Sequence, residues 1–419
     1  MRTHVKATVR EGAVLTEVLK NDVWAERTTC RVCDSGELHA VLSLGNQYLV
    51  NFTAIPDLDL PKAPLELVRC SDCGLLQLSV TVNRDLLYRN FWYRSSVNQT
   101  MRDALNDVVN SAAEFVQEGT WLDIGANDGY LLSRVPDRFR RIACEPARNF
   151  KEDLHKVSDH VISDYFSAKH DCLMATERKG ACDVVTTIAM FYDLDNPSDF
   201  VADIAKVLSP TGVWINQLND APTMMERNAF DAICHEHVCY YDLPSLDKLY
   251  RKHGLRIVGV TYNEVNGGSM RVFAQKASVP AASWHLGDHV GVSERSATLF
   301  SQRVWKWKTQ MIDLLRGPLE TPRGLWLYGA STKGCCLLQY LDCPGAFRAI
   351  ADRNPAKHGL KMAGTWLDVV SEDEMRADNP RFLFALPWAF RDEFVKRERD
   401  LLNSGTTLVF PLPNIELVL

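Results

Sequence analysis

The chain has 419 residues, 46% of them hydrophobic, and a formal net charge of -6. This length exceeds what one ordinary hydrophobic core accommodates, so we expect two or three domains and no large-scale disorder. The acidic balance and the lack of a block rich in lysine and arginine argue against nucleic acid as a partner, because binding a phosphate backbone needs many cationic contacts.

The N-terminal residues and the hydrophobic pattern bear on the compartment. Residues 1–6 are charged but are not followed by the apolar stretch and cleavage site of a signal peptide. No apolar run approaches the ~20 residues that a membrane span needs. We therefore expect a cytoplasmic protein without membrane contact. Its 12 cysteines would stay reduced there, so metal ligation, burial or reactivity must explain them.

The first predicted domain, residues 1–85, contains two pairs of cysteines among short strand-like runs. Cys30 and Cys33 form one pair, Cys70 and Cys73 the other. Their spacing lets four thiolates converge on one tetrahedral zinc ion and leaves no open position, which predicts a structural zinc site. Two alternatives remain: four ordinary buried cysteines, or a zinc ribbon that binds nucleic acid, although few basic or aromatic residues flank the pairs.

The second predicted domain, residues 86–278, alternates helical and strand patterns. A helical pattern over 101–116 precedes an apolar strand that ends at Asp123, and further strands are expected at 141–144, 184–187 and 213–216. Such alternation is typical of a parallel, doubly wound sheet. We therefore predict a Rossmann-like domain within an α/β protein.

A glycine-rich turn follows the first of these strands. Asp123, Gly125, Asn127 and Gly129 stand close together and open a helix, whose N-terminus is electropositive. Their spacing differs from the Gly-x-Gly-x-x-Gly of a dinucleotide site, and the carboxylates of Asp123 and Asp128 would repel a pyrophosphate. They suit a ligand with an ammonium and a sulfonium group, S-adenosylmethionine (SAM). The alternative is a purely structural strand, turn and helix.

Two further acidic residues extend the predicted SAM site. Glu145 ends the next strand, where its carboxylate can accept hydrogen bonds from both ribose hydroxyls. Asp164 follows the strand after that. It either reaches the adenine amine or caps a helix.

The segment 230–241 gathers His235, Glu236, His237 and two tyrosines. Methylation of carbon requires a base that removes a weakly acidic C–H proton, and histidine or glutamate with a tuned pKa can serve. In an extended strand His235 and His237 would share a face, so they could also bind one metal ion. A polar strand edge with satisfied histidines is the third interpretation.

The third predicted domain, residues 279–419, begins with a long helix and restarts the strand and helix alternation, with strands at 325–328 and 349–351. The loop 329–334 between strand and helix could bind phosphate through backbone N–H groups, with Ser331 and Lys333 as side-chain partners. If that phosphate belongs to a nucleotide, Asp352 and Arg353 at the next strand end would contact its nucleoside. A structural turn is the alternative, and irregular glycine spacing disfavours an NAD-linked oxidoreductase.

The chain resembles the TDP-sugar C-methyltransferases that make branched deoxysugars. Five motifs in the same order carry this resemblance: the two cysteine pairs, residues 91–98, the SAM loop, residues 234–241 and residues 329–334. The resemblance implies a zinc domain, a SAM domain and a Rossmann-like domain. It also implies a nucleotide-linked 4-keto-6-deoxysugar as substrate (TDP-, GDP- or CDP-linked), His237 as the base, and Glu236 and Tyr93 beside it. We expect a monomer.

Two departures from the family pattern concern the substrate. Well-known members carry a histidine just after the fourth strand and a tyrosine before His-Glu-His, where this chain has residues 190–192 and Cys234. Tyr192 is expected to replace part of the lost polarity. The remaining substrate contacts are assigned to Asn219, His235 and Tyr241. An O- or N-methyltransferase, and a zinc-ribbon binding protein with an inactive methyltransferase fold, remain the rival functions.

Overall fold

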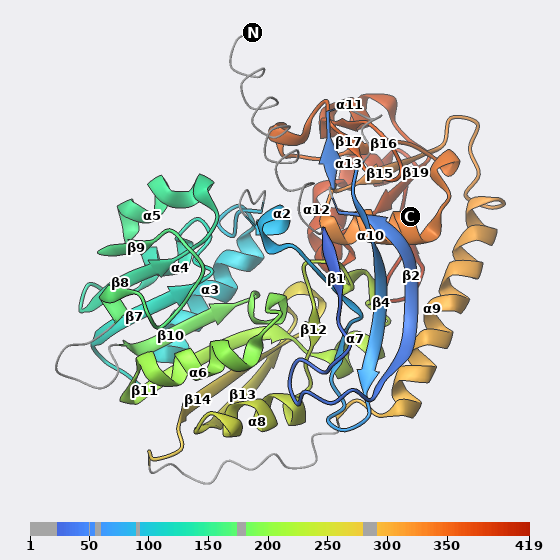
Figure 1. Cartoon of the computed structure of the whole chain (residues 1–419). Coiled ribbons are helices and arrows are strands. Elements are labelled where there is room, and N and C mark those ends of the chain that lie inside the picture. The colour runs from blue at the N-terminus through green and yellow to red at the C-terminus, as the bar shows by residue number, and fades with distance from the viewer. Residues whose placement is uncertain (1–22, 50, 55–59, 89–92, 174–181, 280–290) are drawn as a thin grey trace.

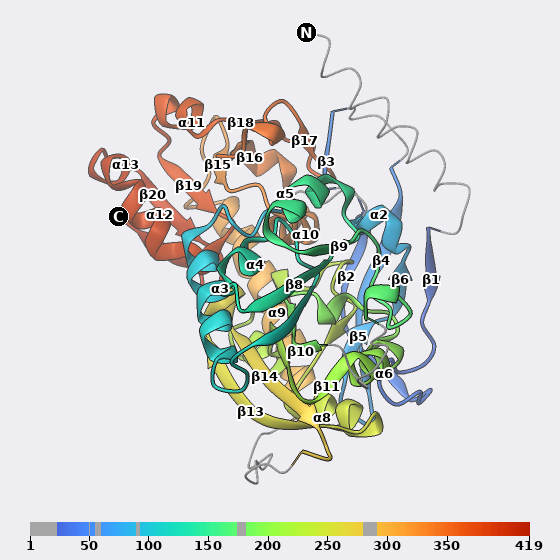
Figure 2. The same cartoon turned by 90° about the vertical axis from the view of Figure 1, so that its left-hand side faces the viewer.

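The computed structural model describes residues 23–49, 51–54, 60–88, 93–173, 182–279 and 291–419 (Figure 1). The start of the motif at 91–98 lies outside these ranges. Three sheets dominate the described chain, and the long strands of the N-terminal region lie beside the central sheet and below the C-terminal sheet in Figure 1. Figures 1 and 2 place the C-terminal sheet at one end of the molecule and β13 (Leu255–Asn263) with α8 (Leu243–Lys252) at the other.

The N-terminal region forms an antiparallel sheet in the order β12-β5-β4-β2. Its strands are β2 (Leu38–Tyr48), β4 (Lys62–Cys70), β5 (Leu76–Leu78) and β12 (Cys239–Tyr240), the last contributed by a distant part of the sequence. Smaller pairs join β1 (Trp24–Glu26) to β6 (Val80–Val82) and β3 (Phe52–Thr53) to β17 (Lys361–Met362). The region therefore contacts both other parts of the molecule through backbone pairing.

The central sheet has seven strands in the order β13-β14-β11-β10-β7-β8-β9. Six of them run in the same direction, and β14 inserts antiparallel between β11 and β13. The strands other than β13 are β7 (Gly119–Ile124), β8 (Phe139–Cys144), β9 (His160–Ile162), β10 (Cys182–Ile188), β11 (Leu208–Asn219) and β14 (Ser269–Lys276). The helices are α2 (Arg84–Tyr88), α3 (Gln99–Ala112), α4 (Tyr130–Arg134), α5 (Lys151–Val157), α6 (Pro197–Val207), α7 (Ala221–Glu226) and α8. The predicted doubly wound sheet is confirmed.

The C-terminal sheet follows the order β18-β16-β15-β19-β20-β21, the strand order of a Rossmann fold with an antiparallel last strand. Its strands are β15 (Leu325–Tyr328), β16 (Phe347–Ala351), β18 (Val369–Val370), β19 (Phe382–Ala385), β20 (Thr407–Phe410) and β21 (Glu416–Val418). The helices are α9 (Glu294–Leu315), α10 (Thr332–Leu341), α11 (Glu372–Asp378), α12 (Arg391–Arg397) and α13 (Arg399–Asn403). The second Rossmann-like unit is thus also present.

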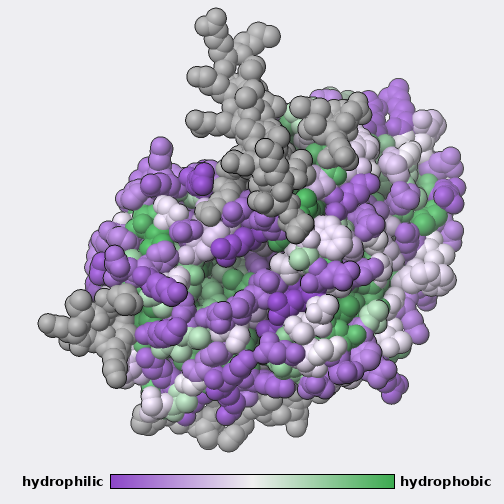
Figure 3. Space-filling model, in the orientation of Figure 1, coloured by the Kyte–Doolittle hydropathy of each residue, from purple (hydrophilic) through white to green (hydrophobic). Residues whose placement is uncertain are grey.

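One hydrophobic core runs through all three parts, because Leu67 of β4, Trp214 of β11 and Leu327 of β15 belong to the same cluster of buried side chains. On the face seen in Figure 3, hydrophilic side chains dominate and hydrophobic ones form small separate groups between them. Among the described helices, none combines the length and apolar character that a membrane crossing needs.

Candidate active site

The four predicted zinc ligands, Cys30, Cys33, Cys70 and Cys73, come together with all sulfur atoms within 4.8 Å of one another. The Sγ atoms of Cys30 and Cys73 are 3.5 Å apart, and those of Cys33 and Cys70 are 3.6 Å apart. Four thiolates about 2.3 Å from a tetrahedral zinc ion are separated by about 3.8 Å, so the cluster has the size of a closed zinc site.

The two cysteine pairs have the same local geometry. The N–H of Cys30 donates to Ser35 O, and the N–H of Cys70 donates to Leu75 O. Each pair is followed by a residue with positive φ, Asp34 at 62° and Gly74 at 82°. These reversals turn both backbones around the sulfur cluster. The predicted structural zinc site therefore fits the chain, and no other group of metal-binding side chains occurs within the described ranges.

A cavity of about 1200 Å³ holds most of the remaining predicted site. Sites for one small molecule commonly measure about 300–1000 Å³, so this cavity has room for a cofactor and a second ligand. It is lined by Tyr93, Asp123, Gly125, Asn127, Glu145, Tyr192, Asn219, Glu236, His237, Ser331 and Lys333, among other residues. The cavity thus joins the carboxyl ends of the central strands, the His-Glu-His segment and the N-terminus of α10.

The SAM loop runs from β7 into α4 through three residues with positive φ: Gly125 at 75°, Asn127 at 52° and Gly129 at 79°. A Cβ atom on Gly125 would lie 3.0 Å from Cγ of Met190. The loop therefore needs glycine at this position for space as well as for conformation. Gly129 is the N-cap of α4 and does not line the cavity.

Glu145 is buried at the end of β8 and lines the cavity. Its two carboxylate oxygens accept hydrogen bonds from the N–H groups of Asn127 and Ala147, both at 2.8 Å. Each oxygen keeps a second lone pair, so the carboxylate is held rigidly while it can still accept hydroxyl donors. This arrangement suits the ribose of SAM.

Asp123 is buried at the end of β7, beside Thr186 of β10, whose hydroxyl donates to its Oδ1 at 2.6 Å. Burial raises the pKa of Asp123 to about 7. Among the described residues Asp123 has no cationic partner, so this buried carboxyl in the cavity wall is suited to a ligand that brings a positive charge, as SAM does with its ammonium group.

Residues 93–96 are hydrogen-bonded to the SAM loop. Asn127 donates from Nδ2 to Tyr93 O at 3.0 Å and accepts from Ser95 N–H at 3.0 Å. The hydroxyls of Ser95 and Ser96 donate to Asp128 at 2.7 and 2.6 Å. Asp128 therefore serves this internal contact, which differs from the expectation that its charge faces the cofactor.

His237 lies in a tight turn that ends the His-Glu-His segment. Its Nδ1 is 2.9 Å from Ala232 O, which assigns the proton to Nδ1 and leaves the Nε2 lone pair free to act as a base. The ring packs against that of Tyr192, with centroids 4.3 Å apart. Burial and the positive charge of Lys333 lower the pKa of His237 to about 3, so the imidazole is neutral at physiological pH.

The same turn is anchored to the N-terminal region. His235 Nε2 contacts Ala63 O and Pro64 O, both at 3.2 Å, and Tyr88 donates its hydroxyl proton to Glu236 O at 2.8 Å. Strand β12, which follows directly, pairs with β5. His235 thus lies outside the cavity lining, and the two histidines face different partners, so the metal interpretation of this pair has no support.

Two acids of the cavity wall, the partly buried Asp193 and the buried Asp231, were not predicted. Both have a raised pKa because of burial, and both leave Oδ1 buried without a hydrogen-bond partner among the described atoms. Asp231 Oδ2 accepts from the indole N–H of Trp388 at 2.8 Å. Asp193 follows β10, and its place at a carboxyl strand end was a usable signal. The contact of Asp231 with Trp388 joins residues 157 positions apart and leaves no local signal.

The N-terminus of α10 reaches the cavity from the C-terminal sheet, at the point where the strand order reverses between β15 and β19. Ser331 caps the helix by accepting from Gly334 N–H at 3.0 Å. Lys333 donates to the backbone carbonyl of Asn266 at 3.2 Å. Ligands of Rossmann-like sheets bind at such reversal points, and the helix end and Lys333 both favour an anion there.

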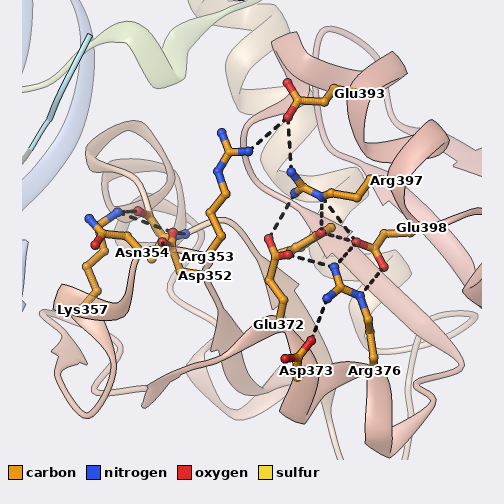
Figure 4. Close-up of polar contacts among 12 residues, drawn as sticks. Asp352, Arg353, Asn354, Lys357, Glu372, Asp373, Arg376, Glu393, Arg397 and Glu398 are labelled. Atoms are coloured by element: carbon orange, nitrogen blue, oxygen red, sulfur yellow. Dashed lines mark hydrogen bonds and ion pairs between the residues drawn. The ribbon is translucent and has the colours of Figure 1, made fainter. Parts of the chain in front are cut away.

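Four further predicted residues do not line the cavity: Asp164, Tyr241, Asp352 and Arg353. Asp164 accepts from Tyr165 N–H at 2.8 Å, and Tyr241 is fully buried against Phe191. Asp352 accepts from Ala330 N–H at 2.7 Å and so supports the loop before α10. Figure 4 shows Arg353 extending away from Asp352 toward Glu393, to which it pairs at 3.3 Å.

Comparisons with known families agree with these three parts. Residues 30–88 match a zinc-binding domain, residues 93–260 match a methyltransferase domain, and residues 264–413 match a C-methyltransferase C-terminal domain. Together they span nearly all of the described chain.

Individual relatives were also found. C-methyltransferase NovU from Streptomyces niveus is 26% identical over 405 residues, which cover 92% of this chain and 95% of the relative. Among solved structures, the PH0226 protein from Pyrococcus horikoshii is 12% identical, with a TM-score of 0.35 over 44% of this chain and 94% of its own. The 1,6-didemethyltoxoflavin-N1-methyltransferase from Burkholderia thailandensis is 12% identical, with a TM-score of 0.32 over 42% and 78%.

These structural similarities are too weak to bear on the reaction. The sequence matches, the central sheet and the cysteine cluster agree with one another and with the resemblance seen in the sequence. The chain is therefore a SAM-dependent C-methyltransferase with a zinc-binding domain and a C-methyltransferase C-terminal domain.

Proposed function

We propose that this enzyme transfers the methyl group of SAM to a ring carbon of a nucleotide-linked 4-keto-6-deoxysugar. The strongest support is the convergence of three groups on one cavity: the SAM loop with Glu145, the neutral imidazole of His237, and the N-terminus of α10 with Lys333. The first group suits a cofactor, the second suits an acidic C–H bond, and the third suits a diphosphate. The resemblance of the sequence to sugar C-methyltransferases indicates that the acceptor is a sugar.

His237 is proposed as the base. Its Nε2 lone pair takes the proton from the carbon beside the ketone, while the hydrogen bond from Nδ1 to Ala232 O keeps the ring in this tautomer. The electron pair of that C–H bond moves into the enolate and then forms the new C–C bond. Bound SAM supplies the electrophilic methyl group. Tyr93 and Glu236 line the same cavity and are proposed to orient the sugar.

Lys333 and Ser331 are proposed to hold the diphosphate at the N-terminus of α10. An anion beside Lys333 would offset the positive charge that lowers the pKa of His237. Binding of the nucleotide would therefore make the imidazole a stronger base when the sugar is in place. Tyr192 and Asn219, which also line the cavity, are proposed to contact the sugar.

The proposal is tested by incubating the enzyme with SAM carrying a deuterated methyl group and a panel of TDP-, GDP- and CDP-linked 4-keto-6-deoxysugars. Mass spectrometry and NMR then locate the label. We expect it on a ring carbon, and we expect His237→Ala to abolish transfer. The matched control is His160→Ala, since His160 is exposed on the edge strand β9 and lies outside the cavity.

Exchange of the acceptor C–H proton in deuterated water, measured without SAM, isolates the base step. It should also be lost in His237→Ala and kept in His160→Ala. Label found on oxygen or nitrogen, with transfer that survives His237→Ala, would instead favour the O- or N-methyltransferase.

A further inference from the structure

Asp193 is a carboxyl in the cavity wall that the steps above leave unused. It ends the short helix Phe191–Asp193 after β10, and its N–H donates to Met190 O at 3.0 Å. Its Oδ1 is buried and has no hydrogen-bond partner among the described atoms, although the residue lines the cavity. Native proteins rarely leave such an atom unpaired, so it is suited to a ligand group.

The surroundings of Asp193 favour its neutral form. Burial is the main cause that raises the pKa of Asp193, and the like charge of Glu236 adds to it. The phenol of Tyr88 and the ring of Tyr192, which packs on the ring of His237, lie close to these carboxyl groups. Two neighbouring carboxylates repel each other, so ionisation of both is unfavourable.

Of these two acids, Glu236 is the better stabilised as an anion. Burial raises the pKa of Glu236, but hydrogen bonds from its own backbone N–H and from the side chains of Cys234 and Asn51 oppose this rise. Asp193 has no such donor on Oδ1. The proton therefore resides on Asp193, which makes this carboxyl of the cavity wall a hydrogen-bond donor.

We propose that Asp193 is a further catalytic residue, whose protonated carboxyl donates a hydrogen bond to the ketone oxygen of the acceptor as negative charge develops there. This proposal rests on the proposed function. His237 Nε2 takes the proton from carbon, the C–H electron pair becomes the enolate double bond, and the carbonyl pair moves onto the oxygen that Asp193 contacts. When the carbon attacks the methyl group, that pair returns to re-form the ketone, and Asp193 keeps its proton.

The wall that carries Asp193 is fixed from the zinc-binding region. Arg31 stands between the first two cysteines, and its side chain is fully buried. It donates to Asp195 Oδ1 at 3.0 Å, and the Thr81 hydroxyl donates to the same oxygen at 2.5 Å. Asp195 lies two residues after Asp193, so the position of Asp193 is fixed before substrate binds. Such preorganisation is what makes a donor effective in stabilising an oxyanion.

The protonation of Asp193 can be tested without any acceptor. Infrared difference spectroscopy at neutral pH should show a protonated-carboxyl band that disappears in Asp193→Asn. The band should persist in Asp199→Asn, because Asp199 is exposed in the first turn of α6. A spectrum in which Asp193→Asn removes no such band would overturn the proposal, whatever the acceptor is.

Turnover tests the catalytic role. Asp193→Ala should lower the rate of methyl transfer by about 10²-fold or more, the usual cost of losing one oxyanion donor. Asp193→Asn keeps a neutral N–H donor, so it should stay within about tenfold of wild type, and SAM affinity by calorimetry should be unchanged in both variants. Wild-type turnover in Asp193→Ala would refute the role. Failure of the proposed function appears differently, as no carbon labelling by the wild type while the infrared band is present.

Discussion

Replacing Asp123 by asparagine should stabilise the ligand-free enzyme and weaken SAM binding at the same time. The carboxyl is buried at the end of β7, and burial raises its pKa from 3.8 to about 7. An acid whose pKa is higher in the folded protein stabilises the fold only while it is protonated. This stabilisation is complete below pH 3.8 and is lost as the pH rises through about 7.

The size of the effect follows from that change in pKa. Raising the pKa from 3.8 to about 7 corresponds to about 4 kcal/mol of folding free energy that the ionised carboxyl costs above pH 7. Asparagine has nearly the same shape, and its Oδ1 can still accept the hydrogen bond from Thr186. The variant should therefore match wild type near pH 4 and exceed it by up to about 4 kcal/mol at pH 8.

Chemical unfolding of the ligand-free protein at several pH values measures this difference, and calorimetry measures SAM affinity. Asp137→Asn is the matched control, because that side chain is fully exposed in the turn before β8. Asp123→Asn should bind SAM at least tenfold more weakly than wild type, the usual effect of losing a hydrogen bond to a charged group. An Asp123→Asn protein with the pH dependence of wild type, or one that is less stable at pH 8, would refute this reasoning.

Three other changes probe the remaining groups. Glu145→Ala should weaken SAM binding by about 10- to 100-fold in calorimetry, because it removes the acceptor for the ribose; unchanged affinity would contradict that placement. Cys70→Ser should release the zinc, as metal analysis would show, and destabilise the protein by several kcal/mol in thermal unfolding, whereas full zinc retention would argue against a four-cysteine site. Lys333→Met should raise the pKa of His237 from about 3, which a histidine NMR titration would detect as protonation at higher pH than in wild type; an unmoved titration would exclude coupling of the two residues.

The fold could be predicted largely from local signals. The strand expected at 325–328 forms with those bounds, and the helix expected at 101–116 forms over Gln99–Ala112. The zinc site could be predicted because the spacing within each cysteine pair is visible in the local sequence. Two of the three interpretations of the segment 230–241 assumed an extended strand, but the segment is a turn around His237, with only Cys239–Tyr240 as a strand. Its conformation depends on contacts with Ala63 and Tyr88, which lie far away in the sequence.

The site was predictable where it follows from strand ends and glycine spacing. Glu145 and His237 line the same cavity. Pairings between distant segments carry no such pattern. The indole of Trp388 on Asp231 and the guanidinium of Arg31 on Asp195 join residues more than 150 positions apart, so only the folded chain reveals them.

Strand β12 limits how the enzyme can be divided or recombined. The segment that carries His237 continues into a strand of the N-terminal sheet, where Cys239 pairs with Gln77 and Tyr240 with Leu76. A fragment that begins after residue 88 would leave this strand without its neighbour and the acceptor site without its support. Chimaeras between relatives should therefore exchange residues 233–241 together with the zinc-binding region, because the two have to be complementary across the β5–β12 pair. The borders of the three matched families are thus borders of sequence similarity and do not separate independent folding units.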